Sequence, residues 1–436
     1  MPIKLNVSGI RGRFAEFTPH WVTRLVSAYT ACMGRGPFLM GSDRRPSGTF
    51  IRPAALAGFL ATGAEICDAG IMPTPILQWL IPRQGYQGGL SITAGHNPFD
   101  WNALVFLNQD GAYLNRFEGE EFFSLFHAGI MRNEPFDRQG VLSPNPPSIE
   151  TYFSALTLDD SASAPLQFVI DCVNGFTCEL PAKLEKALKV RIIPLCCSPE
   201  EISIQRDPEP NTANAALLAR MVRETGSHGG FLLNTDASRV LVVDEKGRPY
   251  SEELSFPLFA SLILEKKPTD LVTNYSTSKV IDQVARRFDV QVHRTDVGQS
   301  EVVHRAAELG CLLAGEGSGS VLFSPFSSGF DAFYFIHEVI SFLKNTGRTL
   351  SDILAGFPTP GIIKENHFRE PGKIYAILDQ VGRSFPEARR LKDGYYLEQD
   401  DSWICIRASA TVNLIRIYLE GDRLRNQLAE IREMLK

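Results

Sequence analysis

The stretch GGLSITAGHNP, at residues 88–98, joins an apolar run of strand type to a turn rich in glycine and asparagine. Similar short apolar runs recur along the chain and alternate with segments whose apolar residues repeat at helical spacing. This alternation predicts parallel strands with helices on the sheet faces, and so an α/β fold. The other strand candidates are GPFLMGSD (36–43), LQFVIDCVNG (166–175), ALKVRIIPL (187–195), GGFLLNTD (229–236) and RVLVVDEKG (239–247), and the helix candidates include FIRPAALAGFLATGAEI (50–66) and AALLARMVRETG (215–226).

The composition is that of a globular protein with several cores. The chain has 436 residues, of which 44% are hydrophobic and 22% charged, which suggests about two to four domains. A net charge of −6 argues against a general nucleic-acid binder. No apolar run approaches the roughly 18–20 residues that span a bilayer, and the first residues lack the pattern of a signal peptide. We therefore expect a cytoplasmic protein without a membrane partner.

The eight cysteines are expected to be reduced. They form no C-x-x-C pair, which argues against a zinc site, and most of them lie in apolar runs. A core of this size needs no disulfide, so we expect buried thiols in a reducing compartment.

Breaks in the pattern predict four domains. The polar or proline-rich segments SPNPPS (143–148), DEKGRP (244–249) and GFPTPG (356–361) separate the regions. We predict α/β domains at residues 1–148, 149–246 and 247–358, followed by a smaller α+β domain at 359–436. The first three regions show no convincing internal repeat in sequence.

Five loops carry the functional signal, because ligands of α/β folds gather where strands end. Each one alone is typical of an ordinary turn. Their order and spacing, together with PTP (73–75), DPEPN (207–211) and GFD (329–331), resemble the α-D-phosphohexomutase superfamily over nearly the whole chain. The five loops are VSGIRG (7–12), TAGHNP (93–98), NTDASR (234–239), GEGSG (315–319) and RASAT (407–411).

The resemblance implies a four-domain architecture around a central cleft, with three similar α/β domains that have mixed sheets and one smaller α+β domain. It also implies a chemistry. A serine of the second loop carries a phosphoryl group to and from a sugar phosphate. A Mg²⁺ ion held by that phosphoserine and by three aspartates neutralises the charge. A lysine acts as general acid and base, the GEGSG-type loop binds sugar hydroxyls, and the last loop binds the phosphate that does not react.

The catalytic positions are replaced in this chain. Gly95 stands where the family has its serine, and glycine offers no nucleophile. Val105, in WNALV, stands where the family has its lysine. His96 and Asn97 remain beside the missing serine. We therefore expect no intact catalytic set.

The loop that would bind the metal also lacks two of the family's ligands. Asp236 and Arg239 are kept, whereas Asn234 and Ser238 replace two aspartate ligands. Since Mg²⁺ favours anionic oxygens, we expect its binding to be weak or absent, and no cofactor.

The binding loops are better preserved. Glu316 and Ser318 can accept and donate hydrogen bonds to a sugar, and Arg407 offers a planar donor fork for phosphate. Hexose phosphate is therefore the expected ligand. Three further residues belong to the candidate phosphate or anion site, namely Arg11, Ser409 and Thr411, although Ala410 replaces the family glycine.

Three hypotheses follow. The first is an inactive relative of the mutases that still binds a phosphosugar, for sensing or for support of a partner enzyme. The second is an enzyme with altered chemistry in the same cleft, in which His96 accepts a phosphoryl group or Asp236 acts as a base. The third is a structural interaction protein with a dead cleft.

Overall fold

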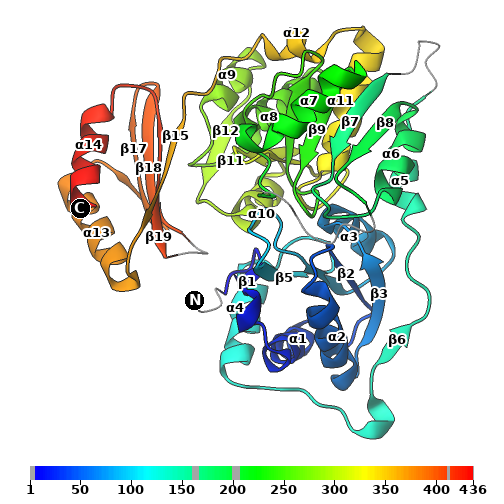
Figure 1. Ribbon diagram of the computed structural model, residues 1–436. Coiled ribbons are helices and arrows are strands. Elements are labelled where there is room, and N and C mark those ends of the chain that lie inside the picture. The colour runs from blue at the N-terminus through cyan, green and yellow to red at the C-terminus, as the bar shows by residue number, and fades with distance from the viewer. Residues whose placement is uncertain (1–4, 160–165, 199–206, 410–412, 436) are drawn as a thin grey trace.

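The structure is a computed structural model of the chain, and it describes residues 5–159, 166–198, 207–409 and 413–435. Four sheets are present in this part of the chain, and each is the centre of one domain. Three domains carry mixed sheets with helices on both faces, and the fourth has an antiparallel sheet (Figure 1). The α/β class and the four-domain architecture are thereby confirmed.

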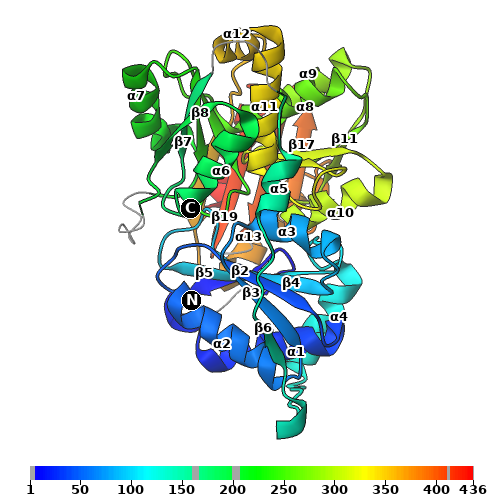
Figure 2. The ribbon, with the colours of Figure 1, turned by 90° about the vertical axis from the view of Figure 1, so that its right-hand side faces the viewer.

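Domain 1 has six strands in the order β1-β5-β4-β2-β3-β6. Its helices cover both faces, and the domain lies beneath domains 2 and 3 in Figure 2. Its elements are β1 (Ile10–Arg13), α1 (Pro19–Met33), β2 (Phe38–Ser42), α2 (Gly48–Ala61), β3 (Glu65–Ile71), α3 (Thr74–Arg83), β4 (Gly88–Ile92), β5 (Trp101–Leu107), α4 (Arg116–His127) and β6 (Val141–Ser143).

The helix predicted over 50–66 ends earlier than expected. Helix α2 stops at Ala61, and the next strand already begins at Glu65. Gly63, with φ +73°, makes the turn between them. A left-handed residue ends a helix, and glycine adopts that conformation without a steric penalty.

Domains 2 and 3 have the same topology, with strand orders β10-β9-β7-β8 and β14-β13-β11-β12. Their elements are α5 (Glu150–Ala155), β7 (Gln167–Asp171), α6 (Glu179–Leu188), β8 (Arg191–Leu195), α7 (Ala216–Thr225), β9 (Gly229–Leu233) and β10 (Val240–Asp244), then α8 (Ser255–Leu264), β11 (Leu271–Asn274), α9 (Val280–Arg287), β12 (Val292–Thr295), α10 (Gln299–Leu309), β13 (Leu313–Glu316), β14 (Ser320–Phe323), α11 (Ala332–Thr346) and α12 (Leu350–Leu354).

A single unit is thus repeated three times. In each of domains 1, 2 and 3, three neighbouring strands are parallel, and a hairpin joins one of them to an antiparallel strand. Those hairpins are β4–β5, β9–β10 and β13–β14. The repeat, which the sequence does not reveal, therefore lies in the topology.

Domain 4 is an antiparallel sheet in the order β15-β19-β18-β17-β16 with two helices. It has its own hydrophobic core, whereas one continuous core cluster runs through domains 1, 2 and 3. Figure 1 accordingly shows domain 4, in orange and red, set to one side. Its elements are β15 (Ile363–Phe368), α13 (Pro371–Ser384), β16 (Arg389–Leu391), β17 (Gly394–Gln399), β18 (Ser402–Ala408), β19 (Leu414–Glu420) and α14 (Arg425–Met434).

One expectation about the cysteines is wrong. Cys178 and Cys197 form a disulfide, with their Cα atoms 5.1 Å apart. The cause is the β7–α6–β8 crossover, because it brings the start of α6 beside the end of β8. Four other cysteines are buried as expected, namely Cys67, Cys172, Cys311 and Cys405. Among the described residues, no helix combines the length and the apolar character that crossing a membrane requires.

Candidate functional site

The hairpin turns of the three repeated units meet at one cavity of about 210 Å³. His96 comes from the β4–β5 turn, Arg239 from the β9–β10 turn, and Glu316 and Ser318 from the β13–β14 turn. Domain 4 adds Arg407 from β18 to the same cavity. The other lining residues are Glu209, Asn211, Glu252, Glu253, Asn274, Ser276, Val297, Gly317, Lys364, Arg416 and Tyr418. Five of the residues predicted from sequence are thereby brought together.

A second, much smaller cavity of about 20 Å³ lies next to it, and His96 lines both. A space of this size holds about one water molecule. It contains the remaining catalytic and metal-loop candidates from the sequence, namely Arg11, Gly95, Val105, Asn234, Asp236 and Ser238, together with Thr74, Thr93, Ala94, Tyr113 and Gln299. The residues that the resemblance places at the nucleophile, lysine and metal positions, Gly95, Val105 and Asp236, thus line the same small cavity.

In the candidate metal loop at 234–239, the polar side chains are hydrogen-bonded to one another. Ser238 Oγ donates to Asp236 Oδ1 at 2.7 Å, and Asn234 Nδ2 donates to Ser238 Oγ at 3.1 Å. The other oxygen of Asp236 lies 3.3 Å from the hydroxyl of Thr74. Mg²⁺ prefers anionic oxygens, and this loop offers one carboxylate whose oxygens are already hydrogen-bonded. The residues present therefore do not fit the ion, and we derive no step through it. In the described ranges, no cluster of three or more His, Cys, Asp or Glu is placed to hold a metal.

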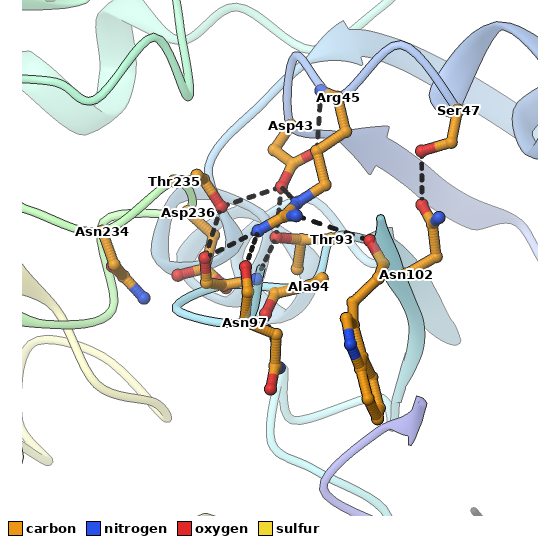
Figure 3. A network of polar contacts seen from close by, with 12 residues as sticks. Asp43, Arg45, Ser47, Thr93, Ala94, Asn97, Asn102, Asn234, Thr235 and Asp236 are labelled. Atoms are coloured by element: carbon orange, nitrogen blue, oxygen red, sulfur yellow. Dashed lines mark hydrogen bonds and ion pairs between the residues drawn. The ribbon is translucent and has the colours of Figure 1, made fainter. Parts of the chain in front are cut away.

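A buried ion pair fixes the shape of the turn at 93–98 (Figure 3). Arg45 Nε donates to Asp43 at 3.2 Å, and both side chains are almost completely buried. The two Nη atoms of Arg45 donate to backbone oxygens of the turn and of its flank, those of Gly95 (3.0 Å), Asn97 (2.8 Å), Pro98 (2.7 Å) and Trp101 (3.4 Å). The clamp therefore holds the turn through its backbone atoms.

Domain 2 joins the same network. Thr235 Oγ1 lies 2.9 Å from Asp43 Oδ2 and 2.8 Å from the oxygen of Gly95 (Figure 3). Asn97 is turned back onto its own loop, where its Nδ2 donates to the oxygen of Ala94 at 2.8 Å. Asn97 is therefore a structural residue of the turn and not a cavity residue.

Two residues that the sequence did not single out, Tyr113 and Gln299, line the small cavity. Tyr113 is 2% exposed and lines the small cavity beside Val105. Its hydroxyl donates to Gln299 Oε1 at 3.2 Å, from the first residue of α10 in domain 3. Ser8 is also part of this contact, because its Oγ lies 2.7 Å from Ser300 Oγ. Domain 3 is thus docked onto domain 1 across the small cavity.

His96 lies in a cationic environment. Burial, together with the nearby guanidinium groups of Arg239 and Arg11, holds the pKa of His96 well below its usual value. The imidazole is therefore neutral near pH 7. Burial also lowers the pKa of Arg11, whose Nη2 donates to the oxygen of Ser8 at 3.1 Å. Arg239 is 8% exposed, and its Nε finds no hydrogen-bond partner among the described residues.

Glu316, in the loop that the resemblance assigns to sugar binding, is fixed by a hydrogen bond. Glu316 is 5% exposed, and its Oε1 accepts from Asn274 Nδ2 at 2.8 Å. Behind the loop, the carboxylate of Glu253 lies against Gly317, where any Cβ would meet it at 1.9 Å. Burial raises the pKa of Glu253 to about 7, even though Lys364 of domain 4 lies 2.9 Å from its Oε1.

Two arginines of domain 4 face this cavity. Arg407 on β18 and Arg416 on β19 are cross-strand partners. Arg407 is 6% exposed, and its Nε and Nη2 donate to Asp393 Oδ2 at 2.9 Å and 2.7 Å. The buried Nε of Arg416 has no hydrogen-bond partner within the described part of the chain. Ser409 is buried directly after β18, and Thr411 lies outside the described residues.

Sequence reasoning did not identify Arg416, although the signal was present. In LIRIYLE, the residues Ile415, Ile417 and Leu419 belong to the core of domain 4, so Arg416 and Tyr418 point to the opposite face. That face is turned toward domain 3, because Tyr275 packs against Tyr396 with ring centroids 4.9 Å apart. Period-two alternation therefore predicts Arg416 on the cleft side.

Three α/β/α domains each place one hairpin turn at a shared cavity, and residues on strands β15, β18 and β19 of the antiparallel sheet domain complete it. The models of domains I, II and III of the phosphoglucomutase/phosphomannomutase family match residues 2–133, 149–247 and 255–360. The chain belongs to the α-D-phosphohexomutase superfamily.

Curated relatives match this sequence over nearly its whole length. A probable phosphoglucosamine mutase of Methanopyrus kandleri is 29% identical over 424 residues, which cover 96% of this chain and 93% of the relative. A phosphoglucomutase/phosphomannomutase of Thermococcus kodakarensis is 28% identical over 427 residues, at 95% and 93% coverage. The crystal structure of a phosphoglucomutase/phosphomannomutase family protein from Burkholderia thailandensis superposes with a TM-score of 0.82 at 21% identity, and covers 98% of this chain and 94% of that one.

Proposed function

We propose that this protein binds a hexose phosphate in its central cleft without interconverting sugar phosphates, and that it serves as a sensor or as support for a partner enzyme. The observation that carries the proposal is the pair Arg407 and Arg416, on the same cavity as Glu316. Arginines suit the phosphate, and a held carboxylate suits sugar hydroxyls. The names of the relatives, which are phosphohexose mutases, support this class of ligand.

The same geometry supports the absence of mutase turnover. Gly95 offers no oxygen to carry a phosphoryl group, and Val105 cannot transfer a proton. Asp236 is bonded to Ser238 and lies beside Thr74 instead of standing open to a metal. Groups that act as one catalytic unit lose their effect together, so three separate losses leave little residual turnover.

A second candidate, an enzyme with altered chemistry, is favoured by one observation. His96 is a neutral imidazole beside several arginines and lies between the two cavities. A neutral imidazole is nucleophilic, and guanidinium groups stabilise a transferring phosphoryl group. Asp236 is the weaker candidate as a base, because both of its oxygens already accept hydrogen bonds.

Calorimetry with hexose 1-phosphates and 6-phosphates, without Mg²⁺, tests the binding proposal. A ligand at about 100 times its Kd stabilises the fold by roughly 2.7 kcal/mol, so a matching rise in Tm is expected. Arg407→Gln should abolish both signals. Arg423→Gln, which removes an exposed cation of the same domain paired with Asp400, should leave them unchanged.

Two further measurements separate the alternatives. Incubation with a hexose bisphosphate labelled in its phosphoryl groups should leave no acid-labile label on the protein. A label that Gly95→Ala retains and His96→Gln removes would establish the altered enzyme instead. If no hexose phosphate produces heat or shifts the Tm, the protein is an interaction protein with a dead cleft.

A further inference from the structure

The disulfide between Cys178 and Cys197 occupies a particular place in domain 2. Cys178 is the N-cap residue of α6, a helix of 10 residues, and its side chain is partly exposed. Cys197 follows β8 and is 3% exposed. The bond therefore ties the start of a helix to the end of a strand, on the side of the sheet where the strands end.

The two segments that it joins have unfavourable backbone conformations. Val173, Asn174 and Cys196 have φ values of +49°, +51° and +50°. Left-handed backbone is costly for residues other than glycine, most of all for a β-branched residue such as valine. The N–H of Asn174 donates to the oxygen of Cys196, so each strained segment holds the other. Such conformations persist only where the surroundings enforce them.

These segments also carry the junction between domains 1 and 2. The N–H of Arg44 donates to the oxygen of Gly175 at 3.0 Å, and its Nη1 donates to the oxygen of Ser198 at 2.8 Å. Gly175 lies directly against Thr235, where any Cβ would come within 2.2 Å of the Thr235 oxygen. Thr235 in turn contacts Asp43 and the oxygen of Gly95.

From these contacts we infer that Cys178 and Cys197 form a reversible redox site, whose bond braces the junction of domains 1 and 2 behind the turn at 93–98. A dithiol reduces it in two steps. One thiolate attacks the sulfur of Cys178, the more exposed of the two residues, and Cys197 leaves as a thiolate. The second thiol of the reagent then displaces Cys178, so two electrons pass to the protein and the reagent becomes a disulfide.

The position of Cys178 favours reversibility. A thiolate at a helix N-terminus is stabilised by the helix dipole, which lowers its pKa. A stabilised reduced form makes a disulfide easier to reduce. On reduction the strained segments lose their link, and the contacts to Arg44 loosen with them. This inference does not depend on whether the cleft binds a hexose phosphate.

The test uses the full-length chain in mixtures of reduced and oxidised dithiothreitol. Free thiols are alkylated and peptides are mapped by mass, while hydrogen exchange is followed at 172–178, 195–198 and 93–98. Cys178 and Cys197 should become alkylated together. Exchange in all three segments should rise several-fold on reduction and should return on reoxidation. The double variant Cys178→Ser/Cys197→Ser should match the reduced protein.

Two controls define the result. Cys311→Ser, which removes a buried thiol of domain 3, should behave as the wild type. Arg44→Gln should raise exchange at 93–98 while the disulfide stays intact, because it breaks the junction downstream of the bond. Two outcomes overturn the inference: free thiols at both positions in fully oxidised buffer, or an intact bond whose reduction leaves exchange in the three segments unchanged.

Discussion

Arg407 and Arg416 stand directly opposite each other on the antiparallel strands β18 and β19, and both face the central cavity. Like charges at directly opposed positions destabilise a sheet. Asp393 offsets the charge of Arg407, but the buried Nε of Arg416 has no hydrogen-bond partner among the described residues. Under the proposed function, a bound phosphate would offset the charge of this pair.

Removal of Arg416 should have opposite effects on stability and on binding. Arg416→Gln should leave the free energy of unfolding of the ligand-free protein unchanged or raise it by up to about 1 kcal/mol, because a cross-strand repulsion is lost. The same variant should weaken hexose phosphate binding by about 10- to 100-fold, the loss of one charged hydrogen bond. Denaturation and calorimetry measure the two effects. A variant that is destabilised and binds normally would contradict this reading of the pair.

Magnesium should not stabilise this protein through the loop at 234–239. Asp236 is the one carboxylate of the trio Asn234, Asp236 and Ser238, and it is hydrogen-bonded to Ser238. Calorimetry should show no Mg²⁺ site there tighter than roughly millimolar. Potassium chloride at equal ionic strength is the control for the Tm. A rise in Tm specific to Mg²⁺, absent in Asp236→Asn, would show that the loop opens to take the ion.

Restoration of the serine alone should cost stability and yield no mutase. Gly95 has φ +55°, so a side chain there is strained, although a Cβ would meet Asn234 and Asp236 only at 3.4 Å. Gly95→Ser and Gly95→Ala should therefore both lower the free energy of unfolding by about 1–2 kcal/mol. Neither should interconvert hexose 1- and 6-phosphates, because metal ligands and lysine are still missing. Turnover in Gly95→Ser that is absent in Gly95→Ala would show that the other losses are tolerated.

The buried carboxyl of Glu253 should make stability depend on pH. Its pKa is raised from 4.5 to about 7, so the folded state binds the proton more tightly than the unfolded state. The stabilisation is complete below about pH 4.5 and is lost as the pH rises through about 7.

Glu253→Gln should flatten this slope, by an amount on the order of 2 kcal/mol across the window. Glu252→Gln is the matched control, because Glu252 also contacts Lys364, at 2.7 Å. Urea denaturation at a series of pH values measures the effect. If the free energy of unfolding depends on pH equally in the wild type and in Glu253→Gln, Glu253 is not the group whose raised pKa causes the dependence.

Much of the fold could be predicted from the sequence, because its signals are local. The stretch at 88–98 does form strand β4 and a tight turn, and the stretch at 215–226 contains helix α7. The triple repeat could not be predicted, since it is defined by strand pairing and not by shared residues. The disulfide could not be predicted for a similar reason. Cys178 and Cys197 are 19 residues apart in sequence, and only the β7–α6–β8 crossover brings them together.

The candidate site was predictable where a motif names the residue. Gly95 and Asp236 line the small cavity, and Glu316 lines the larger one. Tyr113 and Gln299 were not predictable, because their contact joins two domains across 186 residues of sequence. Arg407 also forms an ion pair with the carboxylate of Asp393, a contact that no sequence motif indicates.

The turn at 93–98 is held from behind, by backbone oxygens that Arg45 grips. Because these acceptors are backbone atoms, a change of the His96 side chain leaves the hydrogen bonds to Arg45 in place. The path of the turn is therefore set largely by contacts that the side chain at position 96 does not make. Such a frame lets a substitution change the chemistry of the turn while the path of its backbone is kept.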